Sequence, residues 1–321
     1  MLTVGVDIGG TSLRASVVDP HGTVLETLRV PSAGTGPELD SAIADTVLSL
    51  ADRYPVAGVG LAVAGFVSED RRVVRFAPHL PWRHEAVADN IAARVGLPVV
   101  LEHDANAAAI AEQRFGAAAG AKVAALVALG TGIGGALVLG GDVFRGAHGV
   151  APELGHLRLV PDGRACPCGK RGCWERYCSG TALATTALEM LAEDSSSPLA
   201  AEAAKDPGEI TGERVAQAAE QGDPVALRAV AELARWFGEG LALVADVYDP
   251  EVVVLAGGVS GSAHLFLPEA RRHYAAAITG AGHRPLARVA VAEHGDEAGI
   301  IGAATLAREH IDATARTTGR R

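Results

Sequence analysis

The chain repeats one pattern in VGVDIGGTSLRASVV (residues 4–18) and LVALGTGIGGALVLG (residues 126–140). In both stretches an apolar strand leads into a turn rich in glycine and threonine, and a second apolar strand follows the turn. The second copy lies in an uncharged run of 19 residues, 123–141, but six glycines interrupt that run and argue against a membrane span. The two copies therefore predict a duplicated architecture.

The segments around the two copies alternate between strand and helix patterns. After the first copy we expect strands at 24–30, 56–63 and 99–102 and helices at 38–51 and 85–95. After the second copy we expect mostly helix to about residue 247, a strand at 252–258, a short strand at 289–292 and a final helix from about 297. This alternation predicts a mixed α/β fold, and 321 residues favour two domains.

The composition is that of a globular protein, with 49% hydrophobic and 21% charged residues. The formal charge of −10 argues against nucleic acid as a partner, because such binding needs a clustered excess of Lys and Arg. The first residues, MLTVGVDIGG, lack the basic segment and cleavage site of a secretory signal. We therefore expect a cytoplasmic protein without a membrane partner.

Three cysteines follow one histidine in the segment GHLRLVPDGRACPCGKRGCWER. Cys166, Cys168 and Cys173 form a Cys-x-Cys-x4-Cys cluster, which with His156 supplies the ligands of a Cys3His zinc site. The alternative is a set of buried free thiols, but Pro and Gly between the cysteines indicate a tight knuckle. Cys178 lies outside the cluster, and we expect it to be a core thiol.

Glycine-rich turns suit phosphate, because backbone N–H groups can converge on its oxygens where no Cβ obstructs them. DIGGT offers one such turn, GTGIGG a second, and LAGGVS at 255–260 ends a strand against which adenosine can lie. An aspartate in the first turn can hold Mg2+ through water. Plain hairpin or strand-to-helix turns would also explain each motif taken singly. The candidate nucleotide residues are Asp7, Gly9, Gly10, Thr11, Gly130, Thr131, Gly132, Gly257 and Gly258.

Taken together, DIGGT, EHDANAAA at 102–109, GTGIGG, ELGH followed by CPCGKRGCWE, and LAGGVS resemble the ROK family of bacterial sugar kinases and repressors. The resemblance runs nearly end to end. It implies an actin-like, hexokinase-like (ribonuclease H-like) duplicated two-domain α/β fold with a central cleft, ATP across the cleft and sugar at its base. We expect a smaller domain of residues 1–116 with 298–321, a larger one of 117–297 with the zinc knuckle, and a homodimer or homotetramer.

The resemblance also implies the roles of single residues. Asp104 matches the family's catalytic aspartate, the general base that accepts the proton of the sugar's 6-hydroxyl during attack on the γ-phosphate. Without the family, its place before an alanine-rich segment would suggest a helix N-cap. The zinc is implied to be structural, with His156 contacting sugar through its other ring nitrogen. The residues implied to bind the sugar are Gly65, His79, His103, Glu153, His156 and Glu175.

Three positions depart from the family pattern. His103 and His79 stand where many family kinases have asparagine, and Ser12 stands where a basic residue often follows. Arg14 is a possible substitute for that basic residue. Because histidine is larger than asparagine and supplies only some of its hydrogen bonds, the pocket is altered, and N-acetylglucosamine competes with glucose as the expected substrate.

Three classes of function follow. An ATP-dependent hexose or N-acetylhexosamine 6-kinase is favoured, since the catalytic aspartate, both phosphate turns and the zinc cluster are all present. A sugar-responsive repressor would need a preceding helix-turn-helix, for which the six residues before Asp7 leave no room. A catalytically silent sugar-binding protein and a polyphosphate-dependent hexokinase stay open.

Overall fold

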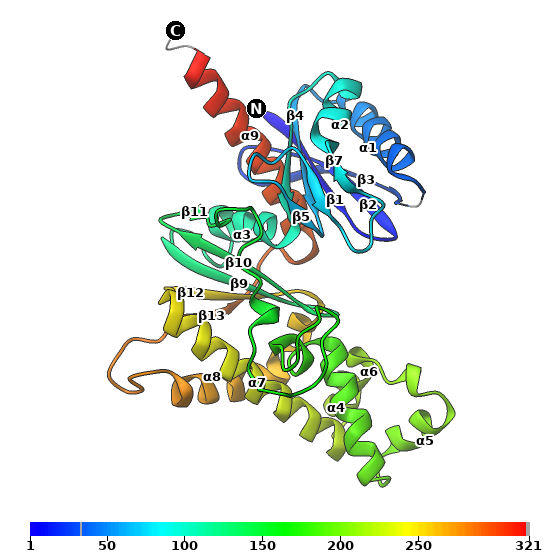
Figure 1. The fold of residues 1–321 in the computed structure, drawn as a ribbon, viewed down its shortest axis with the longest axis vertical. Coiled ribbons are helices and arrows are strands. Elements are labelled where there is room, and N and C mark those ends of the chain that lie inside the picture. The colour runs from blue at the N-terminus through cyan, green and yellow to red at the C-terminus, as the bar shows by residue number, and fades with distance from the viewer. Residues whose placement is uncertain (33, 319–321) are drawn as a thin grey trace. The chain divides into compact units, whose positions relative to one another are not determined.

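The computed structural model describes residues 1–32 and 34–318 (Figure 1). They form the predicted mixed α/β fold and divide into two compact units. The first unit contains Met1–Gly120, Ala136–Pro152 and Glu293–Arg321, and the second contains Ala121–Gly135 and Glu153–Ala292. The domain bounds expected from the sequence, 1–116 with 298–321 and 117–297, stay a prediction, because contacts within a folded chain do not test which segments fold independently. Residues 319–321 of that prediction lie outside the described residues.

The first unit is built on a five-stranded sheet of order β3-β2-β1-β4-β8. Strands β1, β4 and β8 are parallel, and β2 and β3 continue the sheet antiparallel on the other side of β1. The strands are β1 (Leu2–Ile8), β2 (Ser12–Val18), β3 (Val24–Pro31), β4 (Val56–Val63) and β8 (Val99–His103). This agrees with the sequence pattern, with β3 and β8 each one residue longer than expected.

Helices cover both faces of this sheet. Helices α1 (Gly36–Ala51) and α2 (Val87–Val95) pack on one face, where Val4, Val6 and Ile8 of β1 belong to the same apolar core. Helices α3 (Asp104–Phe115) and α9 (Ala298–Thr318) pack against each other, and α9 lies along β1 and β4. Successive residues of a strand point to opposite faces of the sheet. Because helices cover both faces, side chains of β1 are buried on both sides.

Helix α9 approaches the sheet closely because glycines face it. A Cβ at Gly5 would lie 2.0 Å from the Ile300 carbonyl oxygen, and one at Gly60 would lie 1.9 Å from the Ala303 carbonyl oxygen. Two residues before Gly5 on β1, Thr3 Oγ1 donates a hydrogen bond of 2.8 Å to the Ala304 carbonyl. The backbone of α9 therefore occupies the space that side chains at these glycines would take.

We predict that Gly60→Ala destabilises the chain by about 1–3 kcal/mol, because the added methyl group meets backbone atoms that cannot rotate away. Gly261→Ala is the matched control, since a Cβ there has no atom within 4 Å, and it should change the free energy of unfolding by less than about 0.5 kcal/mol. Urea denaturation measures both. Equal unfolding free energies for the two variants would contradict this packing.

The second five-stranded sheet repeats the order of the first, as β11-β10-β9-β12-β13. Here β9, β12 and β13 are parallel and β11 is antiparallel to β10. The strands are β9 (Val123–Leu129), β10 (Ile133–Leu139), β11 (Asp142–Val143), β12 (Val252–Ala256) and β13 (Arg288–Val291). The duplication predicted from the two sequence copies is confirmed.

The helices of the second unit are α4 (Gly180–Glu193), α5 (Pro198–Lys205), α6 (Gly212–Glu220), α7 (Pro224–Tyr248) and α8 (Ala263–Ala277). Helix α7 is the longest of these, and it packs against α8, α4 and α6. Its N-cap, Asp223, accepts hydrogen bonds of 2.9 Å from the backbone of Val225 and Ala226. Among the described residues, no helix combines the length and apolar character needed to cross a membrane.

Three differences from the sequence-based expectation are local. A small sheet of β5 (Phe66–Val67), β6 (Val74–Phe76) and β7 (Arg83–Glu85) was not foreseen, because strands this short show no clear alternation. The helix expected from residue 85 begins at Val87, since Glu85 pairs with Val74 in that sheet. The strand expected to reach residue 258 ends at Ala256, because Gly257 turns the chain with φ of +81°.

Candidate functional site

The carboxyl edge of the first sheet gathers the predicted residues of the first unit. Ile8 of β1 pairs with Val63 of β4, and Val63 pairs with His103 of β8, so the three parallel strands end side by side. The DIGGT turn, Gly65 and Asp104 follow these strand ends directly. In open α/β sheets, ligands bind at the carboxyl ends of the strands.

Asp104 is the first residue of α3. The helix N-cap is His103, with φ −64° and ψ 139°, so Asp104 is not the cap that its local pattern suggested. Asp104 Oδ1 accepts a hydrogen bond of 2.7 Å from the Ala105 backbone N–H and lies 3.3 Å from His103 Nε2. The side chain is 45% exposed, so Oδ2 is open to a ligand.

A buried ion pair supports the junction between β8 and α3. Glu102 is 2% exposed, and its Oε2 accepts a hydrogen bond from Arg145 Nε at 2.7 Å and lies 2.6 Å from Arg145 Nη2. Its Oε1 accepts from the His103 backbone N–H at 3.1 Å and from Asn106 Nδ2 at 2.9 Å. The carboxylate thus holds the backbone before Asp104 and a side chain of α3 after it. The sequence analysis missed this pair, although a charged residue in a strand otherwise made of apolar residues was a signal.

Asp7 lies at the end of β1 and pairs with Arg14. Their strands are in register, and Arg14 Nη2 donates to Asp7 Oδ2 at 2.6 Å and to the Asp296 carbonyl at 2.9 Å. Burial raises the pKa of Asp7, the Arg14 charge lowers it, and the neighbouring Asp104 charge raises it further. Arg14 therefore supplies positive charge beside the DIGGT turn, whereas Ser12 accepts hydrogen bonds from Arg29.

His79 lies in the loop between β6 and β7, next to the DIGGT turn. A Cβ at Gly10 would lie 3.3 Å from the His79 Cβ, which places the loop and the turn in contact. Arg83 Nη1 donates to the carbonyls of Ala77 at 2.6 Å and Leu80 at 2.7 Å. These two hydrogen bonds hold the backbone of the loop on both sides of His79. Within the first unit, the structure therefore brings the DIGGT turn, His79, His103 and Asp104 to one edge of the sheet.

The second unit places its two glycine turns side by side in the same way. Ala128 of β9 pairs with Ala256 of β12, so Gly130 and Gly257 follow adjacent strands. A Cβ at Gly257 would lie 2.5 Å from the Leu129 carbonyl oxygen, and its φ of +81° also favours glycine. These constraints explain a glycine at 257 without reference to a ligand.

A cavity of about 740 Å³ opens beside these turns. Gly130, Thr131 and Gly258 line it together with apolar side chains that include Leu183, Leu233 and Phe266. The starts of α4 and α6 also line it, at Gly180, Thr181, Thr211 and Gly212, and the sequence analysis did not identify these residues. The volume is in the range of small-molecule sites.

The knuckle of residues 156–175 is anchored to α7. Trp174 is fully buried, its Nε1 donates to the Trp236 carbonyl at 2.9 Å, and its ring stacks on Phe237 with centroids 6.1 Å apart. Cys166 N–H donates to the Lys170 carbonyl at 2.9 Å, which closes the tight turn between the cysteines. The knuckle therefore has a fixed position on the second unit.

The predicted ligand atoms of the knuckle converge. The donor atoms of His156, Cys166, Cys168 and Cys173 all lie within 4.8 Å of one another. Cys168 Sγ and Cys173 Sγ are 3.6 Å apart, and Cys166 Sγ is 3.7 Å from His156 Nδ1. Two sulfurs bound to one tetrahedral zinc at about 2.3 Å each would be about 3.8 Å apart. The four residues thus fit a metal ion, and burial raises the pKa of Cys166 to about 12 where no cation offsets it.

Two carboxylates flank the knuckle histidine. His156 Nε2 lies 4.0 Å from Glu153 Oε2, while Nδ1 lies 3.9 Å from Glu175 Oε1 on the side of the cysteines. Glu175 Oε2 accepts from the Ile133 backbone N–H at 3.2 Å, and a Cβ at Gly132 would lie 2.4 Å from it. Glu175 therefore connects the knuckle to the GTGIGG turn within the second unit.

Comparisons with known proteins identify the family of the chain. The model of the ROK family matches residues 3–310. The chain belongs to the ROK family. It is 44% identical over 310 residues to a glucokinase of Streptomyces coelicolor. The aligned region covers 96% of this chain and 98% of that protein.

Solved ROK structures have the same fold. A ROK family glucokinase from Streptomyces griseus, in complex with glucose and AMPPNP, is 43% identical with a TM-score of 0.83, over 96% of this chain and all of that one. A ROK hexokinase from Thermus thermophilus is 34% identical with a TM-score of 0.81, over 98% of this chain and all of that one. The predicted hexokinase-like fold class is confirmed.

We predict that Glu102→Gln lowers the free energy of unfolding of this ROK protein by about 1–3 kcal/mol, because it leaves the Arg145 charge without its carboxylate. The cost stays below that of a fully buried pair, since Arg145 is 26% exposed. Asp89→Asn, which removes the exposed Arg72–Asp89 pair, is the control and should cost less than about 0.5 kcal/mol. Guanidinium denaturation distinguishes the two, and equal costs would contradict the supporting role of Glu102.

Proposed function

We propose that this ROK protein is a glucose kinase that transfers the γ-phosphate of ATP to the sugar's 6-hydroxyl. The observation that carries the proposal is the open carboxylate of Asp104 at the start of α3, in a chain that matches glucokinases along nearly its whole length. The relative solved with glucose and AMPPNP supports both the sugar and the nucleotide. No comparable support favours N-acetylglucosamine.

Asp104 acts as the general base. Its Oδ1 is engaged by the Ala105 N–H, which orients the carboxylate, and Oδ2 accepts the proton as the hydroxyl oxygen attacks phosphorus. The Glu102–Arg145 pair holds the backbone beneath it, so little reorganisation accompanies the reaction. Since phosphoryl transfer asks little covalent chemistry of the protein, alignment supplies most of the rate.

Sugar hydroxyls are held by carboxylates and ring nitrogens. Glu153 and Glu175 each offer acceptor oxygens that orient a ring through paired hydrogen bonds, and His156 Nε2 faces away from the cysteines. In the first unit, His79 and His103 supply ring nitrogens where asparagine is usual, and the backbone at Gly65 completes the set.

The glycine turns hold the nucleotide. Gly130 and Thr131, which line the cavity, direct a backbone donor and a hydroxyl to phosphate, and Gly258 borders the base. Gly132 and Gly257 belong to the same two turns but do not line the cavity. The apolar lining of the 740 Å³ cavity suits a purine better than a polyanion, so we favour ATP over polyphosphate. In the first unit, Gly9, Gly10 and Thr11 cradle the terminal phosphates, and Asp7 holds the water shell of Mg2+.

The knuckle holds a structural Zn2+ through His156 Nδ1 and the thiolates of Cys166, Cys168 and Cys173. The convergence of these atoms within 4.8 Å supports this ligand set. A closed Cys3His site leaves no open position for a reacting water, so the ion would supply rigidity rather than Lewis acidity. It fixes the ring of His156, and through it the sugar-binding edge of the knuckle.

A homodimer or homotetramer and a cytoplasmic location remain predictions for this chain. Size-exclusion chromatography with light scattering measures the first directly.

A coupled ADP-release assay with ATP and Mg2+ tests the function. We expect turnover with glucose to exceed that with N-acetylglucosamine, mannose and N-acetylmannosamine. Asp104→Asn should lower kcat by about 10²- to 10⁴-fold and leave glucose affinity near the wild-type value, because the amide binds but does not accept a proton. Asp52→Asn, an exposed carboxylate that ends α1, is the control and should be fully active.

Two results would overturn this proposal. The absence of ADP release with every sugar would favour a silent sugar-binding protein, and full activity of Asp104→Asn would remove its assigned role. A clear preference for N-acetylglucosamine would replace the substrate while keeping the reaction.

We predict equimolar zinc in the purified protein by elemental analysis. Cys166→Ser should lose the metal and unfold at lower temperature, because structural zinc contributes directly to folding. Cys178→Ala is the matched control: that cysteine is fully buried outside the cluster, and the variant should retain the metal. A metal-free preparation that is folded and fully active would contradict the assignment.

A further inference from the structure

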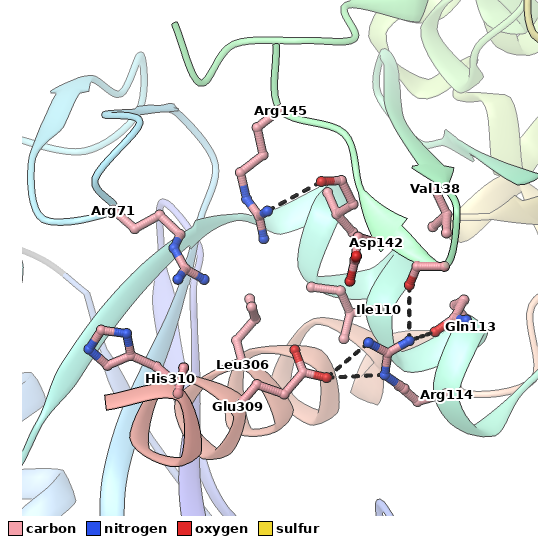
Figure 2. A pocket seen from close by; sticks show the side chains of 13 residues that line it. Arg71, Ile110, Gln113, Arg114, Val138, Asp142, Arg145, Leu306, Glu309 and His310 are labelled. Atoms are coloured by element: carbon pink, nitrogen blue, oxygen red, sulfur yellow. Dashed lines mark hydrogen bonds and ion pairs between the residues drawn. The ribbon is translucent and has the colours of Figure 1, made fainter. Parts of the chain in front are cut away.

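A second cavity lies in the first unit. Three arginines and one histidine line it, and they come from four separate elements. Its volume is about 230 Å³, the liquid volume of roughly eight water molecules at about 30 Å³ each. Arg71 reaches it from the loop between β5 and β6, Arg114 from α3, Arg145 from the segment after β11, and His310 from α9 (Figure 2). None of the residues assigned above to sugar, nucleotide or metal lines it.

Two of these arginines are already engaged, to different extents. Arg114 donates from Nε and Nη2 to Glu309 Oε1, and from Nη1 to Gln113 and to the Gly141 carbonyl, so four of its five donors are used. Arg145 donates from Nε to Glu102 and from Nη1 to the Val143 carbonyl, and its Nη2 lies 2.6 Å from Glu102 Oε2. Arg145 therefore keeps N–H groups for a ligand, whereas most donors of Arg114 are already used.

Arg71 differs from both because no hydrogen bond or ion pair engages its guanidinium among residues 1–32 and 34–318. This guanidinium is partly buried, and its side chain extends toward the same space as that of Arg145 (Figure 2). Burial lowers the pKa of Arg71 and the Arg145 charge lowers it further, whereas the charges of Glu102 and Glu309 raise it. A partly buried cation beside a second cation costs free energy unless an anion joins them.

The backbone of Arg71 is also strained toward this position. Its φ is +60°, which is unfavourable for a residue with a Cβ. Its N–H donates to the Ser68 carbonyl at 2.9 Å and its carbonyl accepts from the Leu101 N–H at 3.0 Å, so the surrounding structure holds this conformation. Glycine at this position would relieve the strain. Strained backbone that the surrounding structure holds in place is found preferentially at functional sites, so this position is a candidate for one.

The remaining lining groups define what would fit. The carboxylate of Glu309 is taken by Arg114, and Asp142 is an exposed residue at the edge of the cavity. His310 has Arg71 and Arg72 as charged neighbours, and both lower its pKa together with burial. Ile110 and Leu306, which belong to one apolar cluster, cover the floor. The corner formed by Arg71 and Arg145 is thus positive, the ring of His310 lies beside it as a further hydrogen-bonding group, and the adjoining surface is apolar.

We propose that this cavity is a binding site for a small oxyanionic metabolite, with Arg71, Arg145 and His310 holding a phosphate or carboxylate group and the rest of the molecule covering Ile110 and Leu306. Guanidinium groups match both head groups through paired hydrogen bonds. The site is separate from the kinase residues, so it does not depend on the proposed catalytic activity.

Calorimetric titration of the full chain tests the proposal with three probes that share a three-carbon polyol skeleton: glycerol phosphate, glycerate and neutral glycerol. We expect at least one of the two anions to bind the wild type and glycerol not to bind. Arg71→Gly should weaken that anion at least tenfold, because it removes one of the two guanidinium groups that hold it. The control Arg272→Ala, at an exposed arginine of α8 paired with Glu269, should bind within twofold of the wild type. Comparison of the two anions identifies the head group.

Arg71→Gly also separates binding from folding. Glycine accepts the positive φ, so the variant should melt no lower than the wild type without anion, yet lose the rise in melting temperature that the bound anion gives. If Arg71→Gly melts lower, Arg71→Gln, which keeps the side-chain stem, replaces it in the titration. Anion affinity unchanged in these variants, or no binding of either anion to the wild type, would overturn the proposal.

Discussion

The parallel pairing of β1, β4 and β8 is the constraint on which the first unit depends. Because Ile8, Val63 and His103 are in register, three turns that are far apart in the sequence begin at the same edge. The close packing of α9 on Gly5 and Gly60 fixes the opposite face of the same strands. The position of Asp104 therefore follows from backbone hydrogen bonds and helix packing rather than from its own side-chain contacts.

The second unit uses the same arrangement with an additional support. Gly130 and Gly257 follow the adjacent strands β9 and β12, as the DIGGT turn and Gly65 follow β1 and β4 in the first unit. The knuckle has no comparable strand framework, and two isolated backbone bridges and the buried Trp174 position it. A short irregular segment of this kind would gain rigidity from a metal ion held by the four converging side chains.

Arg145 connects two features of the first unit. On one side it neutralises Glu102, whose other oxygen holds the backbone of His103. On the other side its remaining donors face the cavity that Arg71 enters (Figure 2). A ligand at that cavity would compete for the guanidinium that steadies the start of α3, which provides a physical route from the cavity to Asp104.

The sequence by itself determined the α/β class, the duplication, most strand and helix positions, and the four side chains that converge in the knuckle. Those features depend on local pattern: apolar alternation, glycine turns, and the spacing of His156 and the cysteines. Only the tertiary structure decided that Arg14 pairs with Asp7, that Glu102 is neutralised by Arg145, and that Arg71 shares a cavity with His310. Each of these contacts joins elements distant along the chain or across strands, and side-chain direction there is set by packing, which no local pattern encodes.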